Sequence, residues 1–372
     1  MRNKNSNKGI TLVALVITII ILLILATISI QSLTKTGLFK NAEKARKETN
    51  KATENQEKRL NEYEDEINKY FGEEKKIEGK IADRVADGTI KIGDYVTYTP
   101  DTVTNTDAKY TTLISNLGTY SGSTENTTST LTQESLKWRV LDVQNGQVRL
   151  ISEVPTTSTI KLQGYNGYNN VVKLLDDTCS TLYNNSKLAS KVQNLKIEDI
   201  TKYMTTQPTE DTTPYSPTKK YYPEILLKEK GQIVNGTAGT ELDLSEQTEF
   251  INQTTKSQVS SWTLKKTYWS QTMNNTDSFT DAKYYELFIN NGSNYNTYWM
   301  SSRCVNADSL NAIFIVRSVT SGGVSAFNLY YSDDFEFSLG YAFRPCITLN
   351  SNVQVTSGSG STEAPFNIQY KN

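Results

Sequence analysis

The sequence predicts an α+β protein in which a long N-terminal membrane and stalk helix precedes a mixed α+β head. Three observations point to this class. Residues 10–30 are apolar and uncharged, residues 38–71 are rich in Lys, Glu, Asn and Ala without a proline, and short strand-like and helical segments alternate from residue 80 onward. A length of 372 residues leaves room for one large domain or two ordinary ones.

The composition excludes several classes of function. The chain contains no histidine, which rules out a Ser/His/Asp triad, a Cys/His dyad and any metal site built on imidazole. A formal net charge of −1 gives no sign of a surface that reads phosphates, so we expect no nucleic-acid partner. The sequence contains no P-loop, no GxGxxG after a strand and no CxxC, so we expect neither a cofactor nor a metal.

The N-terminus contains a segment long enough to enter a membrane. Residues 10–30 form 21 positions without a charge, or about 31 Å of helix, which matches the ~30 Å hydrocarbon thickness of a bilayer. Arg2, Lys4 and Lys8 precede this segment, so the N-terminus is expected in the cytoplasm and the head outside the membrane. A permanent single-pass anchor is one interpretation. A signal peptide is another, although residues 26–28 (ATI) fit its cleavage site poorly.

A third interpretation rests on the residues immediately before the apolar run. The sequence Lys8-Gly9-Ile10-Thr11-Leu12-Val13-Ala14-Leu15 resembles the N-terminal motif of type IV pilins, and the resemblance covers roughly residues 7–71. It implies that a prepilin peptidase cleaves after Gly9, with Lys8 as the basic flank, and that Ile10 becomes an N-methylated first residue. Residues 1–9 are then a prepilin leader, residues 10–30 a transmembrane and assembly helix, and other pilins are candidate partners.

One position departs from the pilin pattern. Pilins usually carry Glu at the fifth mature position, where its carboxylate pairs with the terminal amine of a neighbouring subunit, and here that position is Ala14. A buried amine without this partner is costly, so the formation of a major pilus fibre is left open. Cleavage needs only the glycine and the basic flank, so processing is still expected.

Residues 31–72 are predicted to form a helical stalk. Between Leu38 and Tyr70 the apolar or small residues recur mostly at spacings of three and four, which is a weak heptad pattern. Thr36 and Gly37 are expected to mark a bend or short break. A solvated helix that continues the membrane helix, a helix packed on neighbouring stalks and a helix packed on the head are the three interpretations.

Residues 80–350 are predicted to form one exported head with polar loop insertions. The sequence Gln144-Asn145-Gly146 between two apolar runs is a strong hairpin signal, and Val171–Tyr183 and Ile197–Met204 read as helices. The tracts at 101–135 and 205–223, rich in Thr, Ser and Asn, are expected to be surface loops, and residues 351–372 a polar tail. The expected strands are Tyr95–Thr99, Leu136–Val143, Gln147–Glu153, Tyr298–Arg303, Ala312–Val319, Val324–Tyr330 and Arg344–Leu349.

Four short motifs resemble, by their order, the C-type-lectin-like fold in the broad sense that includes formylglycine-generating-enzyme-like domains. They are residues 137–141 (KWRVL), 164–169 (GYNGYN), 298–303 (YWMSSR) and 340–345 (GYAFRP). The resemblance spans about residues 90–350. It implies a rigid scaffold that displays variable loops for binding, as in bacterial and phage receptors whose C-terminal segment is diversified by retroelements.

The same resemblance places the ligand-facing segment at residues 324–341. Aromatic side chains beside short polar ones are typical of binding surfaces, while the alternation at residues 335–337 also fits a plain pair of strands with aromatic residues inside and acids outside. We expect the ligand to be an unidentified protein or glycan. The candidate ligand-binding residues are Phe327, Asn328, Tyr330, Tyr331, Asp333, Asp334, Phe335, Glu336 and Phe337.

Other chemistry has little support in the sequence. The triplets of calcium-dependent lectins, Glu-Pro-Asn and Trp-Asn-Asp, are absent. Cys179 lies on an apolar helical face and is expected to be buried, whereas a disulfide between Cys304 and Cys346 is left open. Formylglycine-generating enzymes use a cysteine pair, but the residues around these two look structural, so we expect no enzymatic activity.

These features predict a pilin-like cell-surface protein that binds or adheres through a lectin-like head. The alternative is a minor pilin or pseudopilin that acts as a structural subunit of a type IV pilus or a secretion system.

Overall fold

The computed structural model divides the chain into two compact units, residues 1–75 and 76–372. Each unit is described by itself. The residues that the structure describes are 8–35, 37–71, 77–127, 131–208, 211, 213–219, 221–223, 233–234, 237–238, 246–252, 256–258, 262–273, 275–289 and 297–371.

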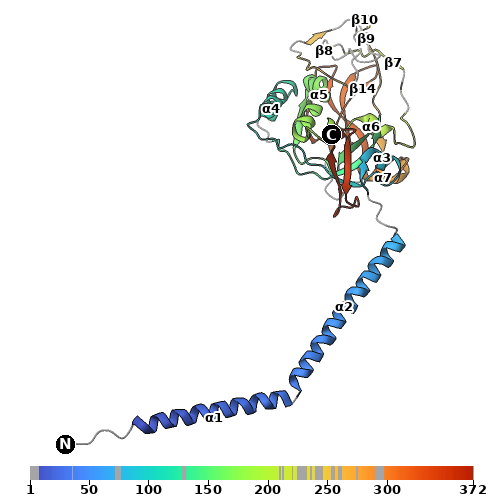
Figure 1. The fold of residues 1–372 in the computed structure, drawn as a ribbon. Helices are drawn as coiled ribbons and strands as arrows, with labels where there is room; N and C mark the ends of the chain where they lie inside the picture. Colours follow the sequence, from blue (N-terminus) through green and yellow to red (C-terminus); the bar gives the residue numbers. More distant parts are fainter. Residues whose placement is uncertain are drawn as a thin grey trace, which may run out of the picture. The chain divides into compact units, whose positions relative to one another are not determined.

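The first unit consists of two helices, α1 (Lys8–Lys35) and α2 (Leu38–Phe71) (Figure 1). Gly37 separates them with a positive φ of 69°, a backbone conformation that costs little only for glycine. Its carbonyl accepts the amide of Asn41 at 2.8 Å, inside the first turn of α2. The break predicted at Thr36 and Gly37 is therefore confirmed at Gly37, and Thr36 lies outside the described residues.

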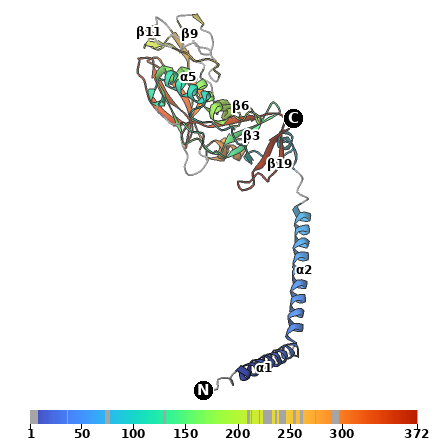
Figure 2. The same cartoon turned by 60° about the vertical axis from the view of Figure 1, so that its left-hand side comes forward.

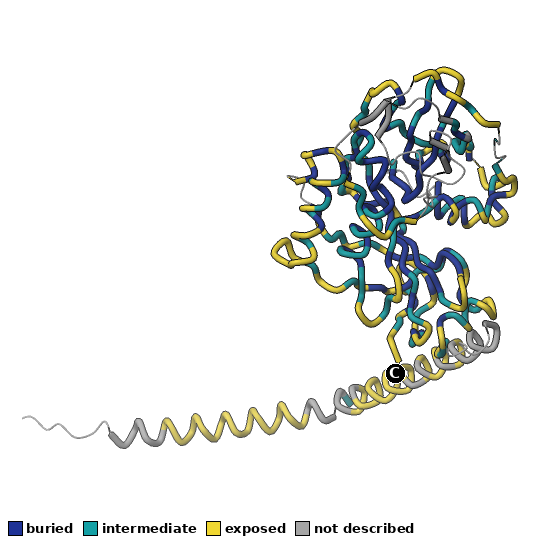
Figure 3. The backbone as a smooth tube through the Cα atoms, turned by 90° about the horizontal axis from the view of Figure 1, so that it is seen from above, coloured by how far each residue is buried: buried dark blue, intermediate teal, exposed yellow. Residues whose placement is uncertain are grey.

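Helix α1 has the length and composition needed to cross a membrane, over the window Ala14–Gln31. None of this window is buried in the unit, and Figure 3 shows the described part of α1 as exposed. The hydroxyls of Thr18 and Thr27 donate to carbonyls four residues earlier, at 2.7 and 2.5 Å. These polar groups are satisfied within the helix, as a lipid environment requires. A membrane anchor and a signal sequence both fit this helix.

The head is a mixed α+β structure, as predicted, and its largest sheet has eight strands among the described residues. Every neighbouring pair in it is antiparallel except β2 with β20, which is parallel. In spatial order the strands are β1 (Gly79–Lys80), β19 (Val353–Ser357), β20 (Phe366–Tyr370), β2 (Tyr95–Thr97), β3 (Trp138–Gln144), β4 (Gln147–Ser152), β18 (Pro345–Leu349) and β6 (Ala189–Asn194).

A second sheet of the head has six strands in the described part of the chain. They are β13 (Gln271–Thr272), β16 (Gly323–Tyr331), β15 (Ala312–Thr320), β14 (Tyr298–Ala307), β17 (Ser338–Ala342) and β5 (Thr159–Gln163). Shorter strands pair elsewhere, β10 (Thr237–Ala238), β9 (Ile233–Val234), β12 (Trp262–Lys265) and β7 (Pro214–Tyr215) in one group and β11 (Lys256–Gln258) with β8 (Tyr221–Pro223) in another.

Helix α5 (Gly164–Tyr183) contacts both large sheets, and it lies beside β14 (Figure 1) and β6 (Figure 2). It contacts β14, β15, β16 and β5 of the six-stranded sheet and β6 and β18 of the eight-stranded one. Tyr168 of α5 packs edge-on against Phe314 of β15, with ring centroids 5.3 Å apart and both rings fully buried. The other helical segments are α3 (Ile81–Ala86), α4 (Ala108–Tyr120), η1 (Thr124–Thr127), α6 (Ile197–Thr201), η2 (Thr276–Ser278) and α7 (Ala282–Phe288).

The seven expected strands and the two expected helices of the head are confirmed, with shifted ends. The hairpin between β3 and β4 turns at Asn145 (φ 50°) and Gly146 (φ 75°), the pair of positive φ angles that a type I′ turn requires. Helix α5 begins at Gly164 rather than at Val171. The motif at residues 164–169 is therefore the first part of this helix.

Two expectations for polar segments are wrong. The tract 101–135 contains α4, which buries Leu113 and Leu117. Residues 351–372 are not a separate tail, because β19 and β20 complete the eight-stranded sheet and bury Val353, Val355 and Phe366. The tract 205–223 holds β7 and β8, and its residues 209, 210, 212 and 220 lie outside the described residues.

Candidate functional site

The residues of the processing motif lie at the beginning of the membrane-type helix. Lys8, Gly9 and Ile10 form the first turn of α1. Ala14, the fifth residue counted from Ile10, is exposed in the first unit.

The segment predicted to bind a ligand, residues 324–341, is not one continuous surface. It forms β16, a turn, and β17, and its side chains divide between the core and the exterior. Tyr330 is fully buried, with its ring 5.8 Å from that of Tyr165 and 6.0 Å from that of Phe314. The prediction that Tyr330 contacts a ligand is wrong, because a side chain with no exposed surface belongs to the core.

Phe327 and Asn328 of β16 are half-buried. The Phe327 ring packs on Tyr341, with centroids 4.6 Å apart, and on Trp299 at 5.9 Å. Asn328 donates from Nδ2 to the hydroxyl of Tyr331 at 3.0 Å. These contacts support the six-stranded sheet. The exposed or half-buried side chains that remain lie within residues 331–337, where only Ser332 is buried.

Residues 331–337, which we call the acidic-aromatic turn, project from the end of β16. The amide of Asp334 donates to the carbonyl of Tyr331 at 3.0 Å, and the amide of Tyr331 donates to the carbonyl of Phe335 at 2.9 Å. Asp334 has a φ of 73°, a strained conformation that Asp tolerates better than most residues. Two hydrogen bonds and this strained residue give the turn a defined shape.

The turn combines exposed apolar and acidic side chains. Phe335 is 59% exposed, and its ring stands edge-on to that of Phe337 at 4.9 Å, while Phe337 lies 5.4 Å from Tyr331. Asp333 and Asp334 are exposed. The turn thus presents an aromatic cluster beside two carboxylates.

The base of the turn is fixed to helix α5. The amide of Gly164 donates to the carbonyl of Phe337 at 3.1 Å. The carboxyl carbon of Glu336 lies 2.6 Å from where a Cβ would stand on Gly164, so Glu336 approaches the N-terminus of α5, where the helix dipole favours an anion. Burial first, and then the Asp334 and Glu336 carboxylates, raise the pKa of Tyr330, which keeps its hydroxyl protonated beneath the turn.

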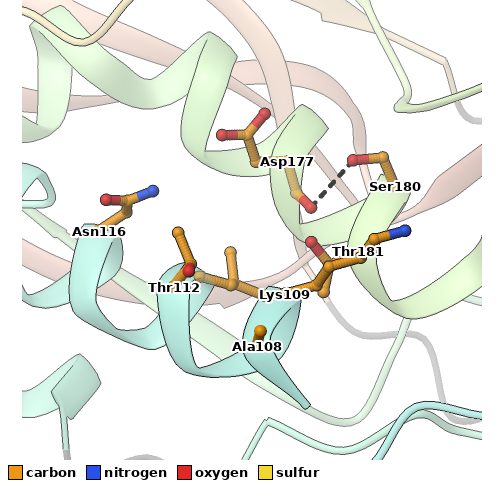
Figure 4. Close-up of a pocket in the computed structure, with 8 residues that line it drawn as sticks. Ala108, Lys109, Thr112, Asn116, Asp177, Ser180 and Thr181 are labelled. Carbon is orange, nitrogen blue, oxygen red and sulfur yellow. Dashed lines mark hydrogen bonds between the residues drawn. The ribbon is translucent and has the colours of Figure 1, made fainter.

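A polar groove between α4 and α5 is a second concave feature, which the sequence did not indicate (Figure 4). Two adjoining cavities of about 350 and 330 Å³ share Ala108, Lys109, Ser180 and Thr181. Figure 4 shows side chains of the two helices facing each other across the first cavity. The spacing of Tyr110, Leu113 and Leu117 could have predicted α4, but no sequence pattern places α4 opposite α5.

A third cavity, of about 650 Å³, is lined by charged side chains of both signs. At its inner wall Arg149 donates to Asp142 through Nε at 2.7 Å and Nη2 at 2.6 Å, and through Nη1 to Asp199 at 2.5 Å. Lys202 and the hydroxyl of Tyr203 also donate to Asp142. Because these cations and carboxylates pair with one another inside the head, we interpret the network as one that stabilises the fold.

The described residues hold no group of three or more Cys, Asp and Glu side chains arranged to bind a metal. The three cysteines are buried, and Cys179 and Cys346 form no disulfide, so the disulfide left open between Cys304 and Cys346 is absent. Burial raises the pKa of the Cys179 and Cys346 thiols, and both are therefore protonated at neutral pH. Comparison with known proteins gives no family, since no family model, no curated protein and no solved structure matches the chain.

Proposed function

We propose that this protein is a pilin-like, membrane-anchored surface protein that binds a protein or glycan through the acidic-aromatic turn of its head. The observation that carries the proposal is Phe335, an aromatic side chain left 59% exposed on a turn of defined shape. Exposed aromatic residues beside short polar ones supply large contact area at a small entropic cost. The turn is thus better suited to recognition than the buried positions of the same segment.

The turn also has the chemistry of a selective contact. Phe335 and Phe337 offer ring faces and edges, and Asp333 and Asp334 offer carboxylates at the surface. A ligand with an apolar face next to a cationic or hydrogen-bond-donating group complements this arrangement. The hydrogen bonds at Tyr331 and the left-handed Asp334 hold the turn before binding, which lowers the entropy lost on association.

The anchor and the head fold are the other parts of the proposal. The apolar window of α1, preceded by Lys8 and Gly9 at the start of the same helix, supports export by the pilin route. A lectin-like assignment of the head is supported by the order of its four motifs and by a mixed α+β architecture with two large sheets.

An adhesion assay tests the turn directly. The native host carrying F335A or D333A is compared with wild type on glass, on a mucin layer and on other bacterial cells. We expect about a tenfold loss of adhesion to whichever surface wild type holds, because an exposed anchor residue carries at least ~1.4 kcal/mol of binding. The matched control is Y370A, since Tyr370 is 40% exposed on β20 of the eight-stranded sheet. Unchanged adhesion of F335A and D333A, or an equal loss in Y370A, contradicts the proposal.

A structural subunit of a pilus or secretion system is the second candidate. It is favoured by the same N-terminal motif and by an apolar helix with no buried surface in its own unit. Shearing of host cells separates the two candidates. A structural subunit is recovered with sheared filaments, whereas a stand-alone receptor stays with the membrane fraction.

A further inference from the structure

A cavity of about 270 Å³ opens beside α6, and none of its lining residues belongs to the acidic-aromatic turn. Glu198 and Thr201 of α6 form one side, and Tyr268 and Trp269 form another. Arg317, from β15, and Asp211 complete the set of lining residues that matter here. The volume is slightly below that of pockets for drug-sized molecules, which suits a ligand of one ring.

Arg317 is the unusual member of this cavity. It is 5% exposed, and its guanidinium lies 4.8 Å from the centre of the Trp269 ring. Nη2 donates to the carbonyl of Thr267 at 2.6 Å, Nη1 reaches the carbonyl of Trp269 only at 3.5 Å, and Nε has no partner. Within the described residues no carboxylate forms an ion pair with Arg317, so a buried positive charge stands without a counter-ion, which is a costly arrangement.

Two of the three other buried arginines in the described residues have more partners than Arg317. Arg149 is paired with Asp142 and Asp199. Arg344 directs Nε and Nη2 to the carbonyls of Ser152 and Glu153 and Nη1 to the hydroxyl of Tyr298. Neither one lines this cavity. Arg317 therefore has neither the ion pairs of Arg149 nor the number of hydrogen bonds of Arg344. It lines a cavity with room for a ligand.

We propose that this cavity, the Arg317 pocket, binds a sugar ring that carries one carboxylate. A planar guanidinium matches a carboxylate in geometry and charge. The rings of Tyr268 and Trp269 provide apolar faces against which a sugar ring stacks. Thr201, Glu198 and Asp211 provide oxygen acceptors for sugar hydroxyls. This inference goes beyond the proposed function, because it names a separate site.

The charges of the pocket select a monoanion over a phosphate. Lys266 and Arg317 contribute two cations to the lining, and Glu198 and Asp211 contribute two carboxylates. The amide of Thr213 donates to Asp211 at 3.0 Å and lowers the pKa of that carboxyl, so Asp211 is ionised at neutral pH. The two carboxylates of the pocket repel a dianionic ligand more strongly than they repel a ligand with a single negative charge.

The test is titration calorimetry on the full chain, held in a detergent without a sugar headgroup. Glucuronic acid is the probe, and glucose is the matched neutral sugar. We expect saturable binding of glucuronic acid and at least about tenfold weaker binding of glucose, because a hydrogen bond to a charged group is lost. Equal binding of the two sugars, or no saturation by glucuronic acid up to about 10 mM, overturns the proposal. Displacement of glucuronic acid by an equal concentration of inorganic phosphate overturns it as well.

Variants locate the site. R317Q and W269L are each expected to weaken glucuronic acid binding at least about tenfold, while R84Q, which removes a partly exposed arginine on α3, leaves it unchanged. Two variants are used because R317Q alters a buried group, and circular dichroism establishes which of them stays folded. Unchanged binding by a folded R317Q or W269L contradicts the assignment. F335A is expected to bind glucuronic acid like wild type, so failure here and failure of the turn in adhesion are distinguishable.

Discussion

Buried charge in the head is concentrated at a few residues, and the Asp142–Arg149 pair is the most completely enclosed. Both side chains are 4% exposed, and they share a bidentate contact. Burying two ions is expensive, and their attraction with the added bonds from Lys202 and Tyr203 offsets that cost. The stability of the head should thus fall more when one partner is removed than when both are replaced by apolar residues.

Removal of one partner of this pair should strongly destabilise the head. We predict that R149M lowers the free energy of unfolding by about 3–5 kcal/mol, because Asp142 is left as a buried charge with fewer partners. The matched control is K161M, which breaks the partly exposed pair of Lys161 with Glu125 and should cost no more than ~1 kcal/mol. Urea unfolding of both variants measures the difference, and equal losses contradict the prediction.

The same pair predicts a dependence of stability on pH. Burial raises the pKa of Asp142, but the hydrogen bonds and charge of Arg149, with Lys202 and Tyr203, lower it further, so the net shift is downward. A lowered pKa in the folded state gives stability that is present above the unfolded value of about 3.9 and is lost as the pH falls through the folded value. Wild type should therefore lose unfolding free energy below about pH 4, and D142N should lose less of it over that range. Parallel pH profiles of the two proteins contradict this prediction.

The exposure of single residues is the least predictable feature at this scale. Tyr330 was expected at the surface because it stands among alternating aromatic and acidic residues. A register shift in the pairing of β15 with β16, between Phe314 and Ile315, sets Tyr330 opposite Phe314 and inside the core. No local pattern in the sequence marks a bulge of this kind. The Arg317 pocket was missed for a related reason, since Glu198, Trp269 and Arg317 are far apart in the chain and meet only in the fold.

At the scale of elements, glycines at strand ends show where the backbone needs close approach. Gly323 begins β16 with a φ of 131°, and a Cβ there would stand 2.3 Å from the carbonyl oxygen of Gln271 in β13. Gly146 in the β3–β4 hairpin also has a positive φ, of 75°, but nothing lies within 4 Å of its Cβ position. A comparison of the two glycines therefore separates the free-energy cost of a positive φ from the cost of a steric clash at the added Cβ.

We predict that G323A destabilises the head more than G146A does. The hairpin variant should lose about 1–2 kcal/mol, the cost of a left-handed L-residue. G323A should lose roughly 3 kcal/mol or more, because β13 must also move away from β16. Thermal unfolding of the two variants tests this order, and a G146A loss equal to or above that of G323A contradicts it.

Elements with a strong local signal were predicted well, and elements stabilised by tertiary contacts were not. The Asn145-Gly146 turn and the apolar face of α5 are local patterns, and both are confirmed. Helix α4 buries only Leu113 and Leu117, and the polar composition of the tract around it outweighs this short apolar pattern. Strands β19 and β20 are short and separated by a Gly/Ser-rich loop, so their pairing with each other and with β1 and β2 supplies the stability that their composition does not show.

At the scale of the whole molecule, the division into two units predicts that the head folds by itself. The unit of residues 76–372 has its own hydrophobic core, which includes the fully buried Trp299 and Phe314, whereas the window Ala14–Gln31 of α1 has no buried surface. A fragment of residues 76–372 should therefore be soluble without detergent and unfold at the temperature of the head in the full chain. Calorimetry of both proteins checks this, and a fragment that aggregates or melts more than about 5 °C lower, roughly 3 kcal/mol, contradicts it.

The proposed function requires that the chain is processed like a pilin and displayed at the cell surface. The most direct measurement is the mass of the N-terminal peptide from protein made in its native host. Processing by a prepilin peptidase predicts a peptide that begins at Ile10 and carries one added methyl group, with residues 1–9 removed. A peptide that still carries Met1 to Gly9, or one that begins beyond Ile30 after cleavage of a signal peptide, contradicts it.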